Sequence, residues 1–450
     1  MEVDGYTPAV KMEKSYENET SEALIQAQYL MNSGDVSAAI ELLLVLEKKT
    51  RKSSDVKSNT RILEKVIEMC HESGDWRRLN EQLKTLSSNH GNLDQSVSSM
   101  IKKAVGYLGT TPDQETETEY IITLRKITEG KMLVEKERAK LTRLLSEIYE
   151  KQGDIEQAND IIQEDQIETF GSLDKREKTD FILEQMRLCL ARNDYVKMAI
   201  ISKKINISYF KNKEAEDLKL RYYELMIMYG IHEVEYLEVS NHYFNIFSTE
   251  SISSDEKKWP DIVARMVMFC ILAPFNNEQS DALNRLYLLP NLEKLPLCHE
   301  LSKLFVSKKL IVWGNLLSSY QSHLLEKLDV FDQSSEYGKK HLEALRQRVV
   351  EHNIRVISKY YSKINLIRLS ELIGLDIEES EKKLCSLIVE KVIYARIDRP
   401  HGIVSFVEPK SVNDKLDMWV SDVNKLLGLV EKTSHLIEKE HVLHKISQTN

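Results

Sequence analysis

Short polar turns interrupt apolar, helix-like segments at regular intervals in the first half of the chain. Four of these turns have aspartate as their last residue, and they occupy residues 33–35, 73–75, 152–154 and 192–194. The aspartates stand at positions 35, 75, 154 and 194, so successive copies are 40, 79 and 40 residues apart. Because 79 is close to twice 40, we expect one further, degenerate copy inside the long interval.

The residues that flank the turns repeat with them. Apolar residues recur six and five positions before each aspartate, and one and four positions after it. The position four residues after the aspartate is occupied by Ala39, Leu79, Ala158 and Met198. Glycine or asparagine ends a helix because each tolerates the left-handed conformation. Aspartate then caps the next helix by accepting a hydrogen bond from a free N–H group. The pattern therefore predicts antiparallel helical hairpins.

Hairpins that recur at about forty residues are typical of helical repeat arrays, in which each repeat buries its apolar face against its neighbours. We predict a mostly α-helical, TPR-like hairpin solenoid over residues 21–332, preceded by a disordered N-terminus at residues 1–20. An irregular helical bundle with common turn residues is the alternative, and it is helical too. A short polar stretch at residues 333–338 is expected to be a linker.

A different pattern follows the linker, over residues 339–410. The expected elements, in chain order, are a helix at 341–361, a strand from Ile364, a helix ended by Gly374, a second helix opening at Asp376 or Glu378, and two β-like runs at 392–397 and 403–407. A tight turn joins the two runs into a hairpin. Helix, strand, helix, helix and hairpin is the order of a winged helix-turn-helix module.

Many winged helices bind DNA through the second helix of the turn, which enters the major groove. In this chain that helix, at residues 376–390, carries five acidic residues against two lysines. Phosphate would be repelled by such a face. We therefore favour a protein-binding winged helix, whose hairpin edge offers unpaired backbone groups to a neighbouring subunit.

The last segment, residues 411–450, is expected to form one long helix as far as about Ser447. Its apolar residues alternate spacings of four and three, which defines a narrow seam typical of a coiled-coil or bundle helix. The seam residues are Val412, Leu416, Trp419, Val423, Leu426 and Val430. Burying six such side chains contributes about 9–18 kcal/mol, against an association cost of about 4–15 kcal/mol. The seam either joins a bundle with other subunits or packs back on the chain's own winged helix.

Composition narrows the possible functions. The 450 residues include 62 Lys and Arg against 71 Asp and Glu, and the net charge of −9 does not suit a general phosphate-backbone binder. Only 15 Gly and 8 Pro are present, which favours helix throughout. No apolar run approaches the about 20 residues that a membrane span needs. The first residues show no basic region followed by an apolar run, so no secretory signal is expected.

Cysteines and catalytic motifs give no sign of chemistry. The cysteines are odd in number, widely spaced and without a CxxC pair, and we interpret them as buried free thiols in a reducing compartment: Cys70, Cys189, Cys270, Cys298 and Cys385. No phosphate-cradling GxxxxGK loop, HExxH or GxSxG motif is present. His441 and His444 have a spacing that could bind a metal, but a solvated helix end is the favoured interpretation. We predict no catalytic residue, no cofactor and no metal.

Six strings of residues carry information beyond this patterning. They span residues 44–51, 79–83, 181–186, 235–239, 273–281 and 349–358. These strings, and the order of helical repeats, winged helix and terminal helix, resemble the PCI-domain subunits of the proteasome regulatory particle lid, of the 26S proteasome non-ATPase regulatory subunit 12 type. Related members scaffold the COP9 signalosome and a translation initiation complex. The resemblance covers nearly the whole chain.

The resemblance implies a non-catalytic scaffold subunit that serves ubiquitin-dependent protein degradation in the cytoplasm and nucleus, as part of a hetero-oligomer. Its implied partners are other PCI-domain lid subunits, the deubiquitylating metalloprotease subunit, the ATPase ring and the core particle, with no nucleic acid and no membrane. In that family six winged helices stack into a horseshoe, and the terminal helices, here the seam residues, form one bundle. By position the hairpin interface would comprise Tyr394, Arg396, Ile397, Ile403, Ser405 and Val407.

Two points stay open at this stage. Residues 390–392 occupy a turn where related chains often carry glycine, which leaves the start of the hairpin undefined. A COP9 signalosome scaffold subunit is the alternative function within the same class, and a nucleic-acid-binding winged-helix regulator is the alternative from another class.

Overall fold

The chain divides into two units, which are described separately. The first comprises residues 1–234 with 248–252, and the second comprises residues 235–247 with 253–450. A computed structural model describes residues 16–88, 94–255, 257–320, 329–331, 336–407 and 412–448. Most of the expected disordered N-terminus (residues 1–15) and part of the expected linker (residues 333–335) lie outside these ranges. Helix α1 begins at Glu17 and helix α19 at Glu336, inside the two segments that were expected to be irregular.

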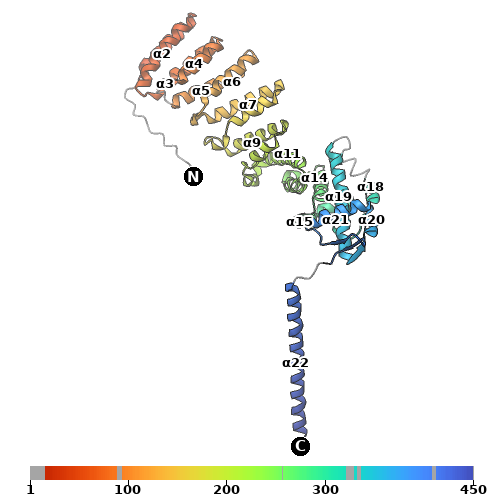
Figure 1. Ribbon diagram of the computed structural model, residues 1–450. Coiled ribbons are helices and arrows are strands. Elements are labelled where there is room, and N and C mark those ends of the chain that lie inside the picture. Colours follow the sequence, from red (N-terminus) through yellow and green to blue (C-terminus); the bar gives the residue numbers. More distant parts are fainter. Residues whose placement is uncertain are drawn as a thin grey trace. The chain divides into compact units, whose positions relative to one another are not determined.

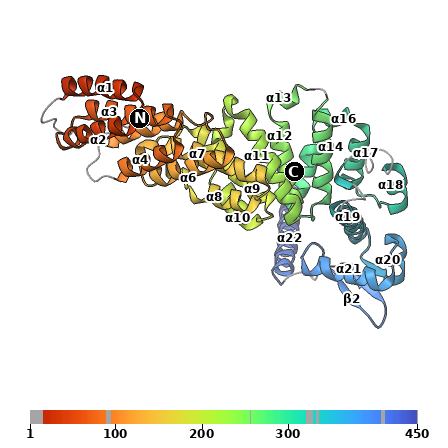
Figure 2. The same cartoon turned by 90° about the horizontal axis from the view of Figure 1, so that it is seen from above.

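The first unit is a succession of α-helices joined by short turns, and these helices follow one another in chain order in Figures 1 and 2. They are α1 (Glu17–Asn32), α2 (Val36–Lys52), α3 (Val56–Glu72), α4 (Trp76–Ser88), α5 (Asp94–Val105), α6 (Gln114–Thr128), α7 (Glu135–Gln152), α8 (Ile155–Glu164), α9 (Lys175–Ala191), α10 (Tyr195–Ser202) and α11 (Glu216–Glu233). Short 3-10 turns η1 (Met132–Val134), η2 (Ile167–Thr169), η3 (Ile207–Lys211) and η4 (Lys213–Ala215) connect some of them. Helix α13 (Glu250–Ser253) spans the junction of the two units.

The four turns identified in the sequence each join two helices. Gly34, Gly74, Gly153 and Asn193 adopt left-handed backbone, with φ of +91°, +69°, +91° and +62°. The position four residues after each aspartate is fully buried in every copy, at Ala39, Leu79, Ala158 and Met198. The predicted hairpins are therefore confirmed, and their turn glycines are required by the backbone they adopt.

The predicted aspartate caps are only half right. The side chains of Asp75 and Asp194 accept hydrogen bonds from the N–H groups of Arg78 and Lys197, at 3.1 and 3.2 Å. Asp35 and Asp154 stand at the same position but make no side-chain cap. At Asp154 only the backbone takes part in the turn: its N–H donates to the Tyr149 carbonyl (3.0 Å) and closes the end of the preceding helix.

The degenerate copy expected between residues 75 and 154 is the hairpin of α5 and α6. Its turn is longer than the others, with Gly109 in the left-handed region (φ +93°) and Asp113 at the N-terminus of α6. A further turn of the same kind was missed in the sequence. Helix α11 ends at Glu233, and its C-cap is Val234, whose φ of +64° is unusual for a β-branched residue.

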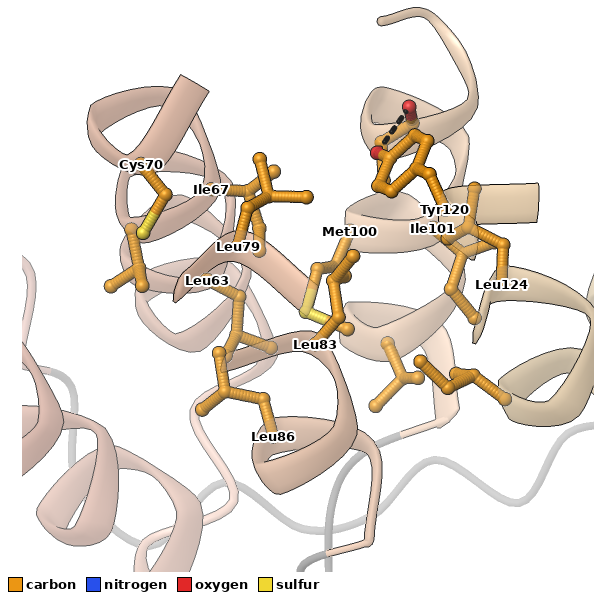
Figure 3. Close-up of a cluster of buried hydrophobic side chains, with 14 of the residues drawn as sticks. Leu63, Ile67, Cys70, Leu79, Leu83, Leu86, Met100, Ile101, Tyr120 and Leu124 are labelled. Carbon is orange, nitrogen blue, oxygen red and sulfur yellow. Dashed lines mark hydrogen bonds between the residues drawn. The ribbon is translucent and has the colours of Figure 1, made fainter. Parts of the chain in front are cut away.

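One continuous apolar core runs through the first hairpins (Figure 3). Leu83 of α4 lies beside Met100 of α5, and both are fully buried, as are Leu79 and Leu86 of α4. The hydroxyl of Tyr120 on α6 donates to the Ala104 carbonyl of α5 at 2.8 Å, so this ring is satisfied where it is fully buried. Repeats that share a core in this way stabilise one another through nearest-neighbour contacts.

Polar contacts between successive repeats have the same period. Glu68 pairs with Lys103 at 3.1 Å, and Glu150 with Arg187 at 2.6 Å, over separations of 35 and 37 residues. Asp180 accepts from Arg221, 41 residues later, at 3.1 Å. The period seen in the turns is therefore also the period of side-chain contacts, as expected of stacked copies rather than an irregular bundle.

The second unit begins with further helices and continues into a small mixed module. Its elements are α12 (Tyr236–Phe247), α14 (Trp259–Leu272), α15 (Asn277–Tyr287), α16 (Pro290–Glu293), α17 (Pro296–Val306), α18 (Trp313–Tyr320), η6 (Asp329–Phe331), α19 (Glu336–Tyr360), β1 (Lys363–Asn365), α20 (Leu366–Ile373), α21 (Ile377–Val389), β2 (Arg396–Asp398), β3 (Ile403–Ser405) and α22 (Val412–Gln448). Helices α12 and α14 pack closely on each other.

Residues 336–407 form the winged-helix module that the sequence predicts. Gly374 ends α20 with φ +75°, and the Asp376 side chain caps α21. The sheet has the order β1-β3-β2 and is antiparallel throughout. Its core comprises apolar residues of α19, α20, α21 and the sheet, among them Ile354, Leu369, Leu384, Leu387 and Val404.

The hairpin starts later than predicted. Strand β2 begins at Arg396, whereas the sequence indicated a strand from Val392. The reason is the end of α21: the N–H groups of Val392 and Ile393 both donate to the Leu387 carbonyl, at 3.0 and 3.4 Å. Lys391 adopts left-handed backbone (φ +59°) to make this turn, at the place where glycine would be expected.

The terminal helix α22 is 37 residues long (Figure 1). It begins at Val412 and ends at Gln448, close to the predicted limits; residues 408–411 lie outside the described ranges. Every residue from 412 to 446 is exposed. The fold is thus the one the sequence predicts: helical hairpins, a winged-helix module and a long C-terminal helix.

Candidate protein-binding surfaces

The predicted hairpin residues lie on two faces of the three-stranded sheet. Arg396 lies opposite Ser405, and Asp398 lies opposite Ile403, on the outward face. Ile397 lies opposite Val404 on the other face and packs against the core of the module. Of the six predicted residues, Ile397 is therefore turned inward. The other five, Tyr394, Arg396, Ile403, Ser405 and Val407, are exposed or half-buried.

Strand β2 is an edge strand. Among the described residues it pairs only with β3, so one side of its backbone has no strand beside it. An edge of this kind presents unpaired N–H and C=O groups to which another chain can add a strand. Ile403, on the outward face of β3, and Val407, two residues beyond the strand, are exposed apolar residues near this edge.

The helix that would enter a DNA groove keeps the acidic character seen in the sequence. Glu378 and Glu379 lie in its first turn, and Asp376 caps it. The nearby wing does not reverse this charge, because Arg399 already pairs with Glu381 at 2.8 Å. Among the described residues of this helix, acidic side chains therefore outnumber basic ones, which does not favour contact with a phosphate backbone.

The six seam residues of α22 are all exposed, with exposed fractions from 39% at Val423 to 72% at Val412. Trp419 is 66% exposed, which is unusual for so large an apolar side chain. Between residues 412 and 446, fifteen large apolar side chains are exposed in total. A single helix without packing partners is marginal in water, and an apolar surface of this extent marks an interaction site.

The apolar surface of α22 is longer and wider than the predicted seam. Ile437 follows Val430 by seven residues and extends the seam toward the C-terminus. Leu429, Leu436 and Leu443 form a second stripe at seven-residue spacing beside it. Seven-residue spacing was the signal that could have found both, since it keeps residues on one side of a helix.

No feature of the described residues suggests catalysis. No group of three or more His, Cys, Asp or Glu residues in these ranges could hold a metal ion. All five cysteines are free thiols, as predicted. Four are buried as predicted, whereas Cys385 is only half-buried, so its predicted burial was wrong. Burial raises the pKa of Cys70 to about 11 and that of Cys270 to about 12, so neither forms a reactive thiolate near neutral pH. Within the described ranges, no helix has both the length and the apolar character to cross a membrane.

Three features together define a protein-binding scaffold of the PCI class. They are the stacked helical hairpins, the winged helix with its acidic recognition helix and open sheet edge, and the long exposed apolar helix. Comparison with known families agrees with this class. The family described as PSMD12/CSN4, N-terminal, matches residues 38–255, and the PCI domain family matches residues 317–408. The family described as the 26S proteasome regulatory subunit RPN5 C-terminal domain matches residues 413–445.

Full-length relatives narrow the class to one family. The chain is 40% identical to 26S proteasome regulatory subunit rpn501 of Schizosaccharomyces pombe over 440 residues, covering 97% of this chain and 99% of the relative. It is 40% identical to RPN5 of Saccharomyces cerevisiae, with 97% and 98% covered. For the 26S proteasome non-ATPase regulatory subunit 12 homolog A of Arabidopsis thaliana the identity is 40%, with 92% and 98% covered. The chain therefore belongs to the RPN5/PSMD12 family of 26S proteasome regulatory subunits.

Proposed function

We propose that this chain is a non-catalytic scaffold subunit of the 26S proteasome lid, which acts in ubiquitin-dependent protein degradation in the cytoplasm and nucleus. Its mechanism is templating: it holds other PCI-domain subunits in register and passes contacts to the core particle, the ATPase ring and the deubiquitylating metalloprotease subunit. Membership of the RPN5/PSMD12 family supports the lid. We also propose the functional division into a repeat array (21–332), a winged-helix module (339–410) and a bundle helix (411–450).

The observation that carries this proposal is the exposed seam of α22. Its six side chains lie in solvent, although their burial would contribute about 9–18 kcal/mol. Association costs about 4–15 kcal/mol, so one helix alone is a marginal anchor. A second contact through the edge strand β2 would make the attachment firm, because two linked sites bind far more tightly than either one.

A COP9 signalosome scaffold remains the second candidate, because the family that matches residues 38–255 is named for a proteasome subunit and a signalosome subunit together, PSMD12/CSN4. Two findings favour the proteasome. The match at residues 413–445 is to an RPN5 C-terminal domain, and the relatives that align along the chain are 26S proteasome subunits. A nucleic-acid-binding role has no comparable support, since Glu378, Glu379 and Glu381 occupy the helix that would contact phosphate.

The experiment that tests the proposal is affinity purification of the tagged full-length chain, with quantitative mass spectrometry of the proteins that co-purify. Lid subunits, ATPases and core particle at near-equal amounts are expected. Signalosome subunits in their place would select the second candidate, and recovery with chromatin or alone would refute both. A chain that lacks residues 411–450 should keep a folded repeat array yet fail to enter the assembly; normal entry of this truncation would refute the role of α22.

A further inference from the structure

The second unit contains a small basic cavity that is separate from the hairpin and from α22. Its volume is about 150 Å³. It lies among the start of α15, the end of α17 and the last turns of α19, and its lining includes Phe275, Phe305, Lys308, Arg355 and Lys359. Two of the strings that resemble the PCI family, residues 273–281 and 349–358, contribute to this lining.

The charged residues that line the cavity are all basic. Arg355, Lys308 and Lys359 line it, and none of its lining residues is an Asp or Glu. This imbalance is notable in a chain whose net charge is −9. His352 also lines the cavity but is neutral, because burial lowers its pKa to about 4 while its Nε2 lies 3.1 Å from the Lys309 carbonyl.

Arg355 is the unusual residue of the set. Its guanidinium carbon lies 3.5 Å from the centroid of the Phe275 ring, so one face of the planar group is stacked. Its Nε is buried without a hydrogen-bond partner, and among the described residues its guanidinium forms no ion pair. The nearest acid on its own helix, Glu351, is already paired with Arg348 at 2.7 Å. Burial lowers the pKa of Arg355 to about 10.

Arg355 is half-buried, and its buried Nε lacks a hydrogen-bond partner, which is unfavourable unless an acceptor completes it. The planar group of Arg355 is suited to a carboxylate, which it can bind through two parallel hydrogen bonds. The size of the cavity decides what carries this carboxylate. Small-molecule sites measure about 300–1,000 Å³, so a cavity of about 150 Å³ accommodates one side chain rather than a nucleotide or polyphosphate. Apolar walls such as Phe305 and Leu283 fit the methylene groups of such a side chain.

We propose that this cavity is a docking socket for an acidic side chain, Glu or Asp, of another subunit of the assembly, which pairs with Arg355 between Lys308 and Lys359. The proposal rests on the proposed scaffold function, because that function supplies the neighbouring subunit. It adds a third contact to those of the hairpin and α22, and it is one in which charge selects the partner.

The first test compares the reactivity of Arg355 in the isolated full-length chain and in the purified assembly. Phenylglyoxal modifies accessible guanidinium groups, and mass spectrometry reports the modified peptide. Arg346 is the matched control, since it lies on the same helix and is exposed. We expect Arg355 to be modified in the isolated chain, protected there by glutarate but not by chloride at equal ionic strength, and protected in the assembly without added anion.

The second test uses variants in competition with the wild-type chain for entry into the assembly. Arg355→Met should enter about 30-fold less well or worse, because it leaves the partner's acid unpaired. Arg355→Lys should fall in between, since it keeps the charge but not the planar fork, and Arg346→Met should enter normally. The isolated Arg355→Met chain should unfold at the same temperature as wild type or higher, because the substitution removes a partly buried charge whose Nε has no hydrogen-bond partner.

The outcomes separate this inference from the function on which it rests. If the tagged chain does not enter the assembly at all, the scaffold function is wrong. If it enters, but Arg355 is equally reactive in the assembly and Arg355→Met competes normally, only the socket is refuted. A lower unfolding temperature of isolated Arg355→Met with normal entry would assign Arg355 a purely internal role. Protection by phosphate but not glutarate, with none in the assembly, would assign the cavity to a free anion.

Discussion

Replacing Trp419 by alanine separates assembly from folding. In this chain 66% of the Trp419 surface is exposed. A tryptophan buries about 150–250 Å² in an interface, so assembly would remove about 100–165 Å² of this residue from water. At about 25 cal/mol per Å² this is worth about 2.5–4 kcal/mol. Alanine retains part of that area, and the expected loss is therefore about 2–4 kcal/mol, or about 30- to 700-fold in affinity.

The assay is a competition inside cells. Wild-type and Trp419→Ala chains carry different tags, are expressed at equal levels, and are counted by mass spectrometry in the purified assembly. The control is Val442→Ala, which alters another exposed apolar residue of α22 (56% exposed) away from the seam. In parallel, the isolated Trp419→Ala chain should keep its unfolding midpoint, since surface substitutions usually change stability by less than about 0.5 kcal/mol.

Two results would refute this reasoning in different ways. Equal recovery of the Trp419→Ala and wild-type chains would show that the seam does not contribute to assembly. A clear loss of stability in the isolated chain would show that Trp419 packs within its own chain, which is the alternative that the sequence left open. If Val442→Ala is as defective as Trp419→Ala, the contact surface is not the seam but the whole helix.

Three further predictions concern the fold. Lys391→Gly should raise the free energy of unfolding by about 0.5–1 kcal/mol, because Lys391 is held at φ +59° where glycine is unstrained. The hydrogen bond from Arg187 lowers the pKa of Glu150 below its ordinary value of 4.5. The pair therefore stabilises the fold above pH 4.5, and this contribution is lost as the pH falls through the lower folded-state pKa. Arg187→Gln should flatten the acid limb of an unfolding titration. Iodoacetamide at pH 8 should label Cys385, which is half-buried, before Cys270. Cys270 is buried with a pKa of about 12, so at pH 8 only about one Cys270 thiol in 10⁴ is ionised.

Each of these predictions has a control. Gly374→Ala, at φ +75°, should destabilise the winged helix that Lys391→Gly stabilises, and a loss of stability in both would contradict the backbone argument. Arg346→Gln, on an exposed surface, should leave the acid limb unchanged. Labelling of Cys270 before Cys385 in the native chain would mean that the core around α14 opens in solution.

The hairpins could be predicted from the sequence because their signals are local. A left-handed turn needs a glycine or asparagine within one or two residues of a helix end, and the apolar positions that pack across the turn lie within six residues of it. Val234 escaped this reasoning since a valine in the left-handed region contradicts local preference.

The winged helix shows where local patterns fail. Residues 392–397 have the β-branched composition of a strand, yet the first of them complete the end of α21 through the Leu387 carbonyl. Strand composition alone could not distinguish these two uses of the same apolar residues. Arg396 and Ile397 were both assigned to the interface, yet as neighbours in β2 they take opposite faces of the sheet, because a strand alternates faces at every residue.

The socket around Arg355 could not be predicted at all. Its residues come from three helices and two loops of the chain. An arginine on the helix at 341–361 looks like an ordinary surface residue in a pattern of helical spacing. Only the packed structure shows the Phe275 ring against its guanidinium and the absence of an acid from the cavity lining.

The positions of the exposed features suggest why the chain would depend on its assembly. The hairpin ends near Val407 and α22 begins at Val412, so only a few residues separate the two predicted contacts. When one contact forms, the other is held at a high effective concentration, and their combined affinity can exceed either one by about 10²–10⁴. Loss of the seam would therefore remove both its own contact and this enhancement of the hairpin. A single apolar helix that is marginal by itself can in this way determine whether the repeat array is incorporated.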